Sequence, residues 1–137
     1  MRLTLKEISD KYQAFNKIIA KKLPIKLSYA ISKNMTTLED EAKVIDDNRI
    51  KLAQTYAEKN EDGSPKIINN SYVIDDIESF NKELSEYYKT EIDIDICKVN
   101  SSILDKLDDP KYDVLSPSEI MTLQFMLEDG TPDTSEN

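Results

Sequence analysis

Apolar side chains recur every seven residues through the stretch between Pro24 and Ala57. The pattern consists of two series: Ile31, Leu38, Ile45 and Leu52, and, four residues after each of these, Met35, Ala42, Arg49 and Tyr56. A narrow apolar stripe with a period of 3.5 residues is typical of a long helix that packs against other helices. We therefore predict one long helix from Pro24 to about Ala57. The first helix of the chain is too short to cover its whole apolar side, so the remaining part is covered either by the C-terminal half of the chain or by a second copy.

A break in this long helix is possible at one stretch, Asn34–Thr37. Thr36 and Thr37 are residue types that can cap a restarted helix, which would break the element in two. The seven-residue pattern passes through without a change of phase, and we therefore favour a continuous helix.

A shorter helix precedes the long one. Thr4 and Glu7 have the spacing of a capping box, which predicts a helix that begins after Thr4. Its apolar positions are separated by three and four residues: Leu5, Ile8, Tyr12, Phe15 and Ile19. Pro24 cannot continue this helix but can open the next one, so we expect a corner at Leu23–Pro24.

The next segment predicts a turn, a β-hairpin and a third helix. Residues 60–64 form the turn, and residues 66–68 and 72–74 form the hairpin around Asn69 and Asn70, which tolerate the positive φ of a tight turn. Asp75 or Asp76 then caps the third helix. The apolar side of this helix consists of Ile77, Phe80, Leu84 and Tyr87.

The last third of the chain predicts one strand and two helices. Apolar and acidic side chains alternate from Glu91 to Val99, which is typical of a half-buried strand. A short helix follows at about residues 102–107. The final helix opens with a second capping box, Ser116 and Glu119, and ends at Gly130. Residues 131–137 have no apolar side chain to anchor them, and we expect them to be disordered.

These elements together predict the fold class and the domain organisation. The fold class is α+β, with a long, coiled-coil-like helical hairpin in residues 1–57. A small antiparallel sheet and two or three shorter helices follow in residues 58–130. The length of 137 residues fits a single domain, which we place at residues 1–130.

The net charge of −9 is unevenly distributed. Residues 1–33 carry eight basic and two acidic side chains, whereas residues 34–137 carry ten basic and 25 acidic ones. The acidic bulk argues against direct binding of nucleic acid or of an anionic membrane. We interpret the asymmetry as basic N-terminal residues lying beside acidic segments of the same chain, with an exposed acidic surface for a basic partner as the alternative. The basic cluster Lys17, Lys21, Lys22 and Lys26 is interpreted as a solvated helix surface.

Several classes of chemistry are disfavoured by the composition. The chain has no histidine, which removes the commonest general base and metal ligand. Cys97 is the single cysteine, so an internal disulfide is excluded and a reducing, cytoplasmic setting is expected. Two glycines cannot build a phosphate-binding loop, and no apolar run is long enough to cross a membrane. We therefore predict no cofactor, no metal and no enzymatic activity.

The strongest candidate for chemistry is the predicted strand that carries Glu91, Asp93 and Asp95. Alternate residues of a strand lie on one side about 6.5–7 Å apart, so three carboxylates could converge on Mg²⁺ or Ca²⁺. A solvated side of a half-buried strand gives the same pattern, and we favour that interpretation. These carboxylates are then candidates for partner binding rather than for metal binding.

Tyr88 and Arg49 complete the predicted partner-binding residues. Tyr87 and Tyr88 offer one ring to the core and one to solvent, and an exposed tyrosine beside an acidic strand is a reasonable interface anchor. Arg49 occupies a position that should be apolar, where a charge can specify register or partner. The alternative is that its charged end simply reaches solvent.

Four motifs give the chain a resemblance to known sequences: Leu23-Pro24-Ile25-Lys26, Lys33-Asn34-Met35, Glu91-Ile92-Asp93-Ile94 and Ser116-Pro117-Ser118-Glu119-Ile120-Met121. The chain resembles small uncharacterised proteins encoded in phages and prophages of low-GC Gram-positive bacteria. The resemblance covers most of residues 3–128, and its motifs are structural. It therefore implies that the protein originates from a phage or prophage and acts in the interior of a host cell, but it assigns no functional residue.

The main functional hypothesis is a non-enzymatic, phage-type protein-binding factor. Inhibition of a host defence nuclease is its most specific form, because carboxylates can mimic phosphate and compete for a basic groove. The partner would then be a basic complex that handles nucleic acid. A virion-assembly protein that self-associates through the long helix, for example as a homodimer, is the alternative. A metal-dependent enzyme built on Glu91, Asp93 and Asp95 is the third.

Overall fold

The computed structural model describes residues 1–129, and the predicted disordered tail, residues 131–137, lies outside these described residues. The elements are, in order: β1 (Arg2–Thr4), α1 (Leu5–Phe15), α2 (Ile25–Tyr56), β2 (Ile67–Ile68), β3 (Ser71–Tyr72), α3 (Ile77–Tyr88), β4 (Glu91–Asp93), β5 (Val99–Asn100), the 3₁₀ helix η1 (Ser101–Asp108), α4 (Pro117–Leu123), the 3₁₀ helix η2 (Gln124–Met126) and β6 (Leu127–Glu128). The predicted α+β class is confirmed.

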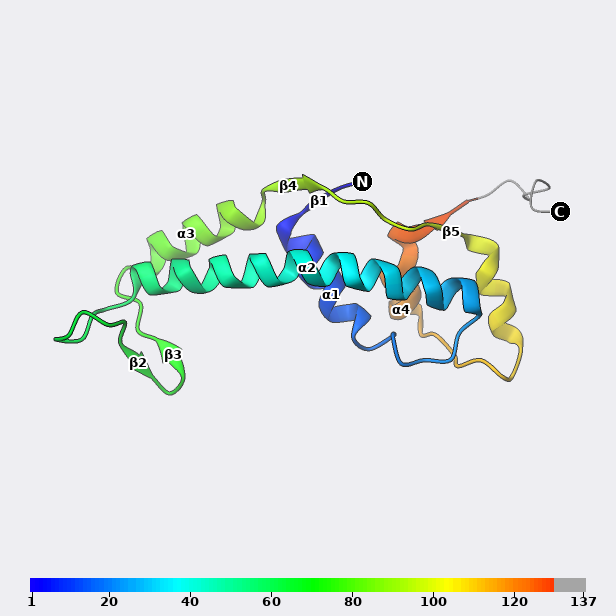
Figure 1. Ribbon diagram of the computed structural model, residues 1–137, viewed down its shortest axis with the longest axis horizontal. Helices are drawn as coiled ribbons and strands as arrows, with labels where there is room; N and C mark the ends of the chain where they lie inside the picture. Colours follow the sequence, from blue (N-terminus) through cyan, green and yellow to red (C-terminus); the bar gives the residue numbers. More distant parts are fainter. Residues whose placement is uncertain (130–137) are drawn as a thin grey trace.

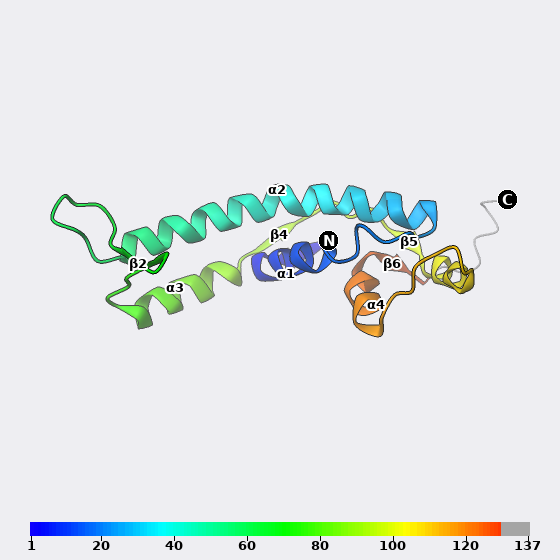
Figure 2. The same cartoon turned by 90° about the horizontal axis from the view of Figure 1, so that it is seen from below.

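Helix α2 runs the length of the molecule, and the other elements lie along it (Figures 1 and 2). Its 32 residues correspond to about 48 Å at 1.5 Å per residue. The predicted continuity through Asn34–Thr37 is confirmed. The hydroxyls of Thr36 and Thr37 donate to the carbonyls of Ser32 and Lys33, four residues back in the same helix, so neither residue caps a new one.

The apolar side of α2 is covered by its own chain. Helix α1 passes beneath the middle of α2, α3 lies along its C-terminal half, and α4 lies near its N-terminal half (Figure 2). Ile31, Leu38 and Ile45 of the seven-residue series are at most 2% exposed. The part of α2 that α1 leaves open is therefore covered by the C-terminal half of the chain, which is one of the two predicted covers.

One main hydrophobic core holds the N-terminal half of α2 to the rest of the chain. Its fully buried members come from α1, the following turn, α2 and the C-terminal segments: Ile8, Phe15, Ile18, Leu27, Ile31, Leu38, Leu123 and Met126. The last α2 residue in this core is Ile45.

The capping residues and the hairpin turn form as the sequence predicts. Thr4 and Ser116 each accept a hydrogen bond from the backbone of the glutamate three residues on, at 3.1 Å in both cases. Asp76 rather than Asp75 caps α3. Asn69 and Asn70 have φ values of 52° and 64° between β2 and β3, as a tight turn requires.

Two helix ends differ from the prediction. Helix α1 ends at Phe15 and the chain continues in turns, which rotates the apolar pattern by one residue: Ile18 is 1% exposed and Ile19 is 43% exposed. The final helix was predicted to reach Gly130, but α4 ends at Leu123. There the chain tightens into η2, which buries Met126, and then extends as β6.

The predicted strand from Glu91 to Val99 is interrupted. Residues 91–93 pair antiparallel with β1, and Val99 belongs to β5, which pairs parallel with β6. Between them, buried Asn34 takes the place of a partner strand. Its amide donates to the Cys97 carbonyl at 2.9 Å and accepts the Cys97 N–H at 2.7 Å. A side chain from α2 therefore fixes this segment where no strand reaches it.

Candidate functional site

The acidic strand β4 is partly neutralised by its neighbour β1. Arg2 lies opposite Asp93 in the antiparallel pair. Its guanidinium contacts Glu91 at 3.3 Å and Asp93 at 3.5 Å. All three side chains are exposed, so these ion pairs add little to stability, but they reduce the negative charge that the strand presents.

No metal-binding cluster forms around the strand acids. Asp95 is exposed beyond the end of β4. Within residues 1–129 no group of three or more Asp, Glu or Cys side chains lies close enough together to hold a metal ion. The hypothesis of a metal centre on Glu91, Asp93 and Asp95 therefore gains no geometric support.

Arg49 is engaged by its own helix. It contacts Asp46, three residues earlier in α2, at 2.7 Å, and this hydrogen bond raises the pKa of the guanidinium above its ordinary value. Its side chain is 43% exposed. This geometry agrees with the interpretation that the charged end of Arg49 reaches solvent. The partner in this contact, Asp46, belongs to the same helix.

Tyr88 is less exposed than the prediction of an exposed anchor implies. Tyr87 and Tyr88 are both half-buried, with ring centroids 5.9 Å apart. Tyr88 lies beside the beginning of α1, whereas the Tyr87 hydroxyl accepts a 3.3 Å hydrogen bond from Asn48 of α2. Of the five predicted partner-binding residues, Tyr88 and Glu91 lie on either side of the turn from α3 to β4, whereas Asp95 lies farther along the chain.

A groove lies between the beginning of α1 and one side of α3. It encloses about 360 Å³ and is lined by Thr4, Lys6, Asn81, Leu84, Ser85, Tyr88 and Lys89. We call it the α1–α3 groove. Tyr88 is the predicted site residue that lines it. The other lining residues were not predicted as site residues, because nothing local shows that α1 and α3 meet.

The distal part of the molecule differs from the rest in packing and in charge. We call residues 46–86 the arm, and residues 1–45 with 87–129 the body. The arm comprises the C-terminal part of α2, the β2–β3 hairpin and α3 to Glu86. It carries ten acidic and five basic side chains, a net charge of −5.

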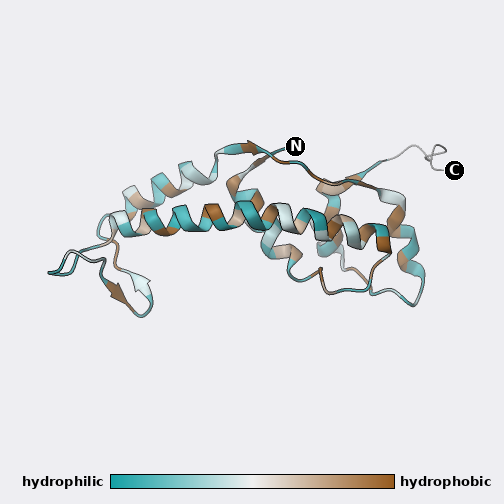
Figure 3. Ribbon diagram, in the orientation of Figure 1, coloured by the Kyte–Doolittle hydropathy of each residue, from teal (hydrophilic) through white to brown (hydrophobic). Residues whose placement is uncertain are grey.

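The arm has little buried surface. Its only buried residues are Ala53 and Ala57. Its two helices are joined by the Tyr56 and Phe80 rings, 5.9 Å apart, and by a 3.3 Å hydrogen bond from the Tyr56 hydroxyl to Glu83. Three isoleucines are half or more exposed: Ile67 (56%), Ile68 (53%) and Ile77 (50%). Figure 3 shows β2 as a hydrophobic strand on a hairpin that projects from the end of α2.

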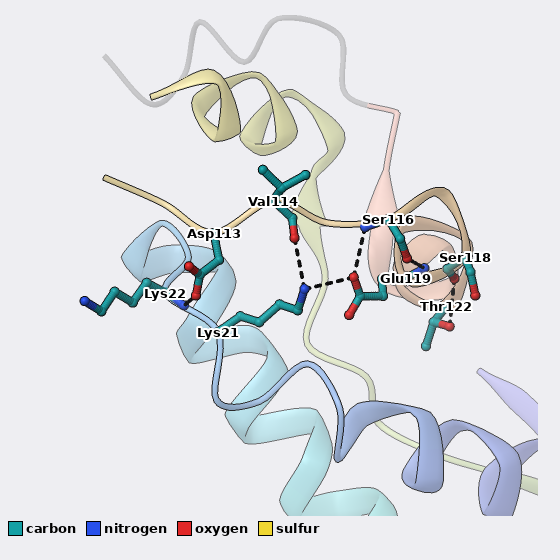
Figure 4. Close-up of polar contacts among 8 residues, drawn as sticks. All are labelled: Lys21, Lys22, Asp113, Val114, Ser116, Ser118, Glu119 and Thr122. Atoms are coloured by element: carbon teal, nitrogen blue, oxygen red, sulfur yellow. Dashed lines mark hydrogen bonds and ion pairs between the residues drawn. The ribbon is translucent and has the colours of Figure 1, made fainter. Parts of the chain in front are cut away.

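The lysines at the corner between α1 and α2 hold the C-terminal segment in place. Lys21 donates to Glu119 at 3.0 Å and to the Val114 carbonyl at 2.9 Å (Figure 4). The Lys22 backbone N–H donates to the Asp113 carboxylate at 2.7 Å. The prediction that these lysines form a solvated surface is wrong for Lys21, whose side chain is only 28% exposed.

Glu119 is held in its charged form at this corner. The Ser116 N–H donates to its carboxylate, and Lys21 donates to the same oxygen. These two contacts, with the backbone hydrogen bond the larger cause, lower the pKa of Glu119 below its ordinary value. The corner supports the interpretation that basic N-terminal residues lie beside acidic segments of the same chain.

Comparison with known proteins found no similar protein. It matches no protein-family model, no curated protein sequence and no solved structure. In the part of the chain that the structure describes, none of the helices combines the length and the apolar character needed to cross a bilayer.

Proposed function

We propose that this protein is a non-enzymatic protein-binding factor whose arm contacts a basic partner. One observation carries the proposal: the arm has only two buried residues and yet holds a net charge of −5 in a chain of net charge −9. An element that adds so little to the core and so much to the surface charge is suited to contact another molecule.

The arm combines the two properties that a protein-binding surface needs. Its carboxylates attract a basic surface over distance and speed the encounter. The exposed Ile67, Ile68 and Ile77 offer apolar side chains that a partner can bury once the two surfaces meet. The predicted strand acids contribute less, because Arg2 already offsets part of the negative charge of Glu91 and Asp93.

Inhibition of a nuclease that defends the host is the specific form of this function that we propose. The resemblance to phage and prophage proteins supports it, as does the capacity of carboxylates to occupy a groove that normally binds phosphate. The partner is then a basic protein that handles nucleic acid, and the protein acts inside the host cell.

Self-association in virion assembly has less support. That alternative relies on the apolar side of α2 being open to a second copy. Ile31, Leu38 and Ile45 on that side are buried by the chain itself. A homodimer through this side of α2 would have to displace α1 and α3.

A capture experiment with charge-reversed variants tests the proposal. The full chain is immobilised, exposed to host lysate, and washed at low and at high salt. The arm variant is Glu61→Lys/Asp75→Lys/Glu86→Lys, at three exposed positions. Its matched control is the body variant Asp105→Lys/Asp108→Lys/Glu128→Lys, which makes the same change of charge at exposed positions.

The expected result is a basic host protein that wild type and the body variant retain at low salt and release at high salt, and that the arm variant does not capture. Loss of capture in the body variant instead would contradict the role of the arm. Recovery of only the protein itself would favour the assembly alternative.

A further inference from the structure

The α1–α3 groove has a regular wall along α3. Asn81, Leu84, Ser85, Tyr88 and Lys89 follow helical spacing of three and four residues, so they form one side of this helix. Ile77 lies seven residues before Leu84 and continues the same side to the beginning of α3, where it is 50% exposed. The wall therefore extends beyond the groove as an apolar stripe.

This side of α3 is apolar but only partly covered. Leu84 and Tyr88 are half-buried and provide the apolar surface of the groove, and α3 has no fully buried residue along its twelve. The opposite wall is the first turn of α1, where Thr4 and Lys6 contribute. The groove thus offers an open apolar floor between two helices.

The charge of the groove is opposite to that of the protein. Two of its seven lining residues are charged, and both are lysines that come from different elements: Lys6 from α1 and Lys89 from the end of α3. Lys6 contacts Asp10 at 3.4 Å, but both side chains are more than 60% exposed. Such a surface pair is weak, so Lys6 can exchange Asp10 for another carboxylate at little cost.

Glu7, which follows Lys6 in the sequence, is already engaged in the capping box. Glu7 accepts the Thr4 N–H at 3.0 Å within the capping box, and this contact lowers its pKa. The N-terminus of α1 also carries the partial positive charge of a helix dipole. The charge of Glu7 offsets this partial positive charge, so an incoming anion is attracted mainly by Lys6 and Lys89 along the apolar floor.

We propose that the α1–α3 groove binds an acidic, amphipathic peptide segment of a protein partner. An apolar side chain of the segment packs on Leu84 and Tyr88, and its carboxylates pair with Lys6 and Lys89. The groove shares Asn81, Leu84 and Ser85 with the arm, but its two lysines lie outside the arm and are opposite to it in charge. The inference therefore goes beyond the proposed function and does not depend on it. The protein would carry one surface for a basic partner and another for an acidic segment.

A displayed library of random peptides tests this inference. Peptides of about 12 residues, roughly three helical turns, are selected on the immobilised full chain. The enriched sequences should combine Asp or Glu with leucine or aromatic residues. A selected peptide is then synthesised with a fluorescent label, and its affinity is measured by anisotropy for wild type and variants.

Two kinds of variant change the groove without touching the core. Lys6→Glu/Lys89→Glu reverses both charges and should weaken binding by about tenfold or more, because charge-assisted contacts are lost and repulsion replaces them. Ser85→Trp places a large side chain at an exposed lining position and should block binding. The matched control Lys17→Glu/Lys26→Glu reverses two exposed lysines outside the groove and should bind within about twofold of wild type.

The outcomes are decisive in either direction. Enrichment of basic peptides, no enrichment at all, or binding that Ser85→Trp leaves unchanged would overturn the inference. The arm variant Glu61→Lys/Asp75→Lys/Glu86→Lys should still bind the acidic peptide. That result would show that peptide binding in the groove does not require the acidic residues of the arm. If the capture experiment finds no basic partner for the arm, binding of the acidic peptide should still be observed.

Discussion

The two halves of α2 lie in different surroundings. From Leu27 to Ile45 the helix contributes its apolar side to the main core, where Leu27, Leu38 and Phe15 of α1 are fully buried. From Asp46 to Tyr56 it is covered mainly by α3, and Ala53 is the one buried residue. The same seven-residue pattern thus gives a well-packed body at one end and a loosely packed arm at the other.

The difference follows from what each half packs against. The body covers α2 with α1, α4 and the β4–β5 segment, which together exclude water from large apolar side chains. The arm covers it with one amphipathic helix, and two helices alone leave one side of each apolar stripe open. The arm contributes little to stability and presents charge and isoleucines instead, which suits it to binding.

Truncation of matched phenylalanines should show the largest contrast. Phe15 is 0% exposed in the body, whereas Phe80 is half-buried in the arm. Phe15→Ala should lower the free energy of unfolding by about 3–5 kcal/mol, and Phe80→Ala by about 1–2 kcal/mol, because less apolar surface is lost. Urea unfolding followed by circular dichroism measures both, and equal losses would contradict the division into body and arm.

Two asparagines offer the next contrast. Asn34→Ala leaves the Cys97 N–H and carbonyl without their partner in a partly buried position, and should cost about 2 kcal/mol. Asn48 makes one exposed 3.3 Å contact, with the Tyr87 hydroxyl, so Asn48→Ala should cost about 0.5 kcal/mol or less. The comparison is read from the urea midpoints of the two variants. A loss for Asn48→Ala as large as that for Asn34→Ala would mean that the arm depends on this contact.

The ion pairs of the two regions should differ in their dependence on pH. The pKa of Glu119 in the folded protein lies below its ordinary value of 4.5, so its stabilising effect is present above about pH 4.5 and is lost as the pH falls through the lowered pKa. Glu119→Gln should therefore lower the urea midpoint at pH 7, and the difference from wild type should shrink towards pH 3.

The control for this experiment is Glu58→Gln in the arm. Glu58 contacts Lys66 at 3.9 Å, and both side chains are substantially exposed. It should change the midpoint little at any pH. A deficit of Glu119→Gln that persists unchanged to pH 3 would show that the carboxylate charge is not what stabilises the corner.

The smallest effect is expected at Arg49. Its contact with Asp46 is local and exposed, and the position belongs to the apolar series of α2. Arg49→Leu should change the free energy of unfolding by no more than about 0.5 kcal/mol. A loss of 2 kcal/mol in urea unfolding would show that Arg49 specifies how α3 packs on α2, as one interpretation of the sequence held.

The features that were predicted from the sequence are the local ones. A capping box such as Thr4 and Glu7 is decided within three residues, as is the tight turn at Asn69 and Asn70. The long helix was also predictable, because its seven-residue pattern repeats within the element itself. The contact of Arg49 with Asp46 is local as well, although the sequence analysis did not predict it.

The features that were missed depend on residues far apart in the chain. Arg2 meets Glu91 and Asp93 across 89 and 91 positions, and Asn34 holds Cys97 across 63. No local sequence pattern predicts these contacts. The candidate site was affected in the same way: the acids of β4 were visible in the sequence, but their neutralisation by Arg2 was not. The acidic residues of the arm were visible as well, but not their position outside the core.

Native-state hydrogen exchange in increasing urea tests the central claim that the arm lies outside the cooperative core. Backbone amides of α2 between Leu27 and Ile45 should exchange only through global unfolding. Amides of α2 between Arg49 and Tyr56, and those of α3, should exchange through a smaller, local opening with a lower free energy and a weaker dependence on urea. Equal protection along the whole of α2 and in α3 would contradict the division into body and arm.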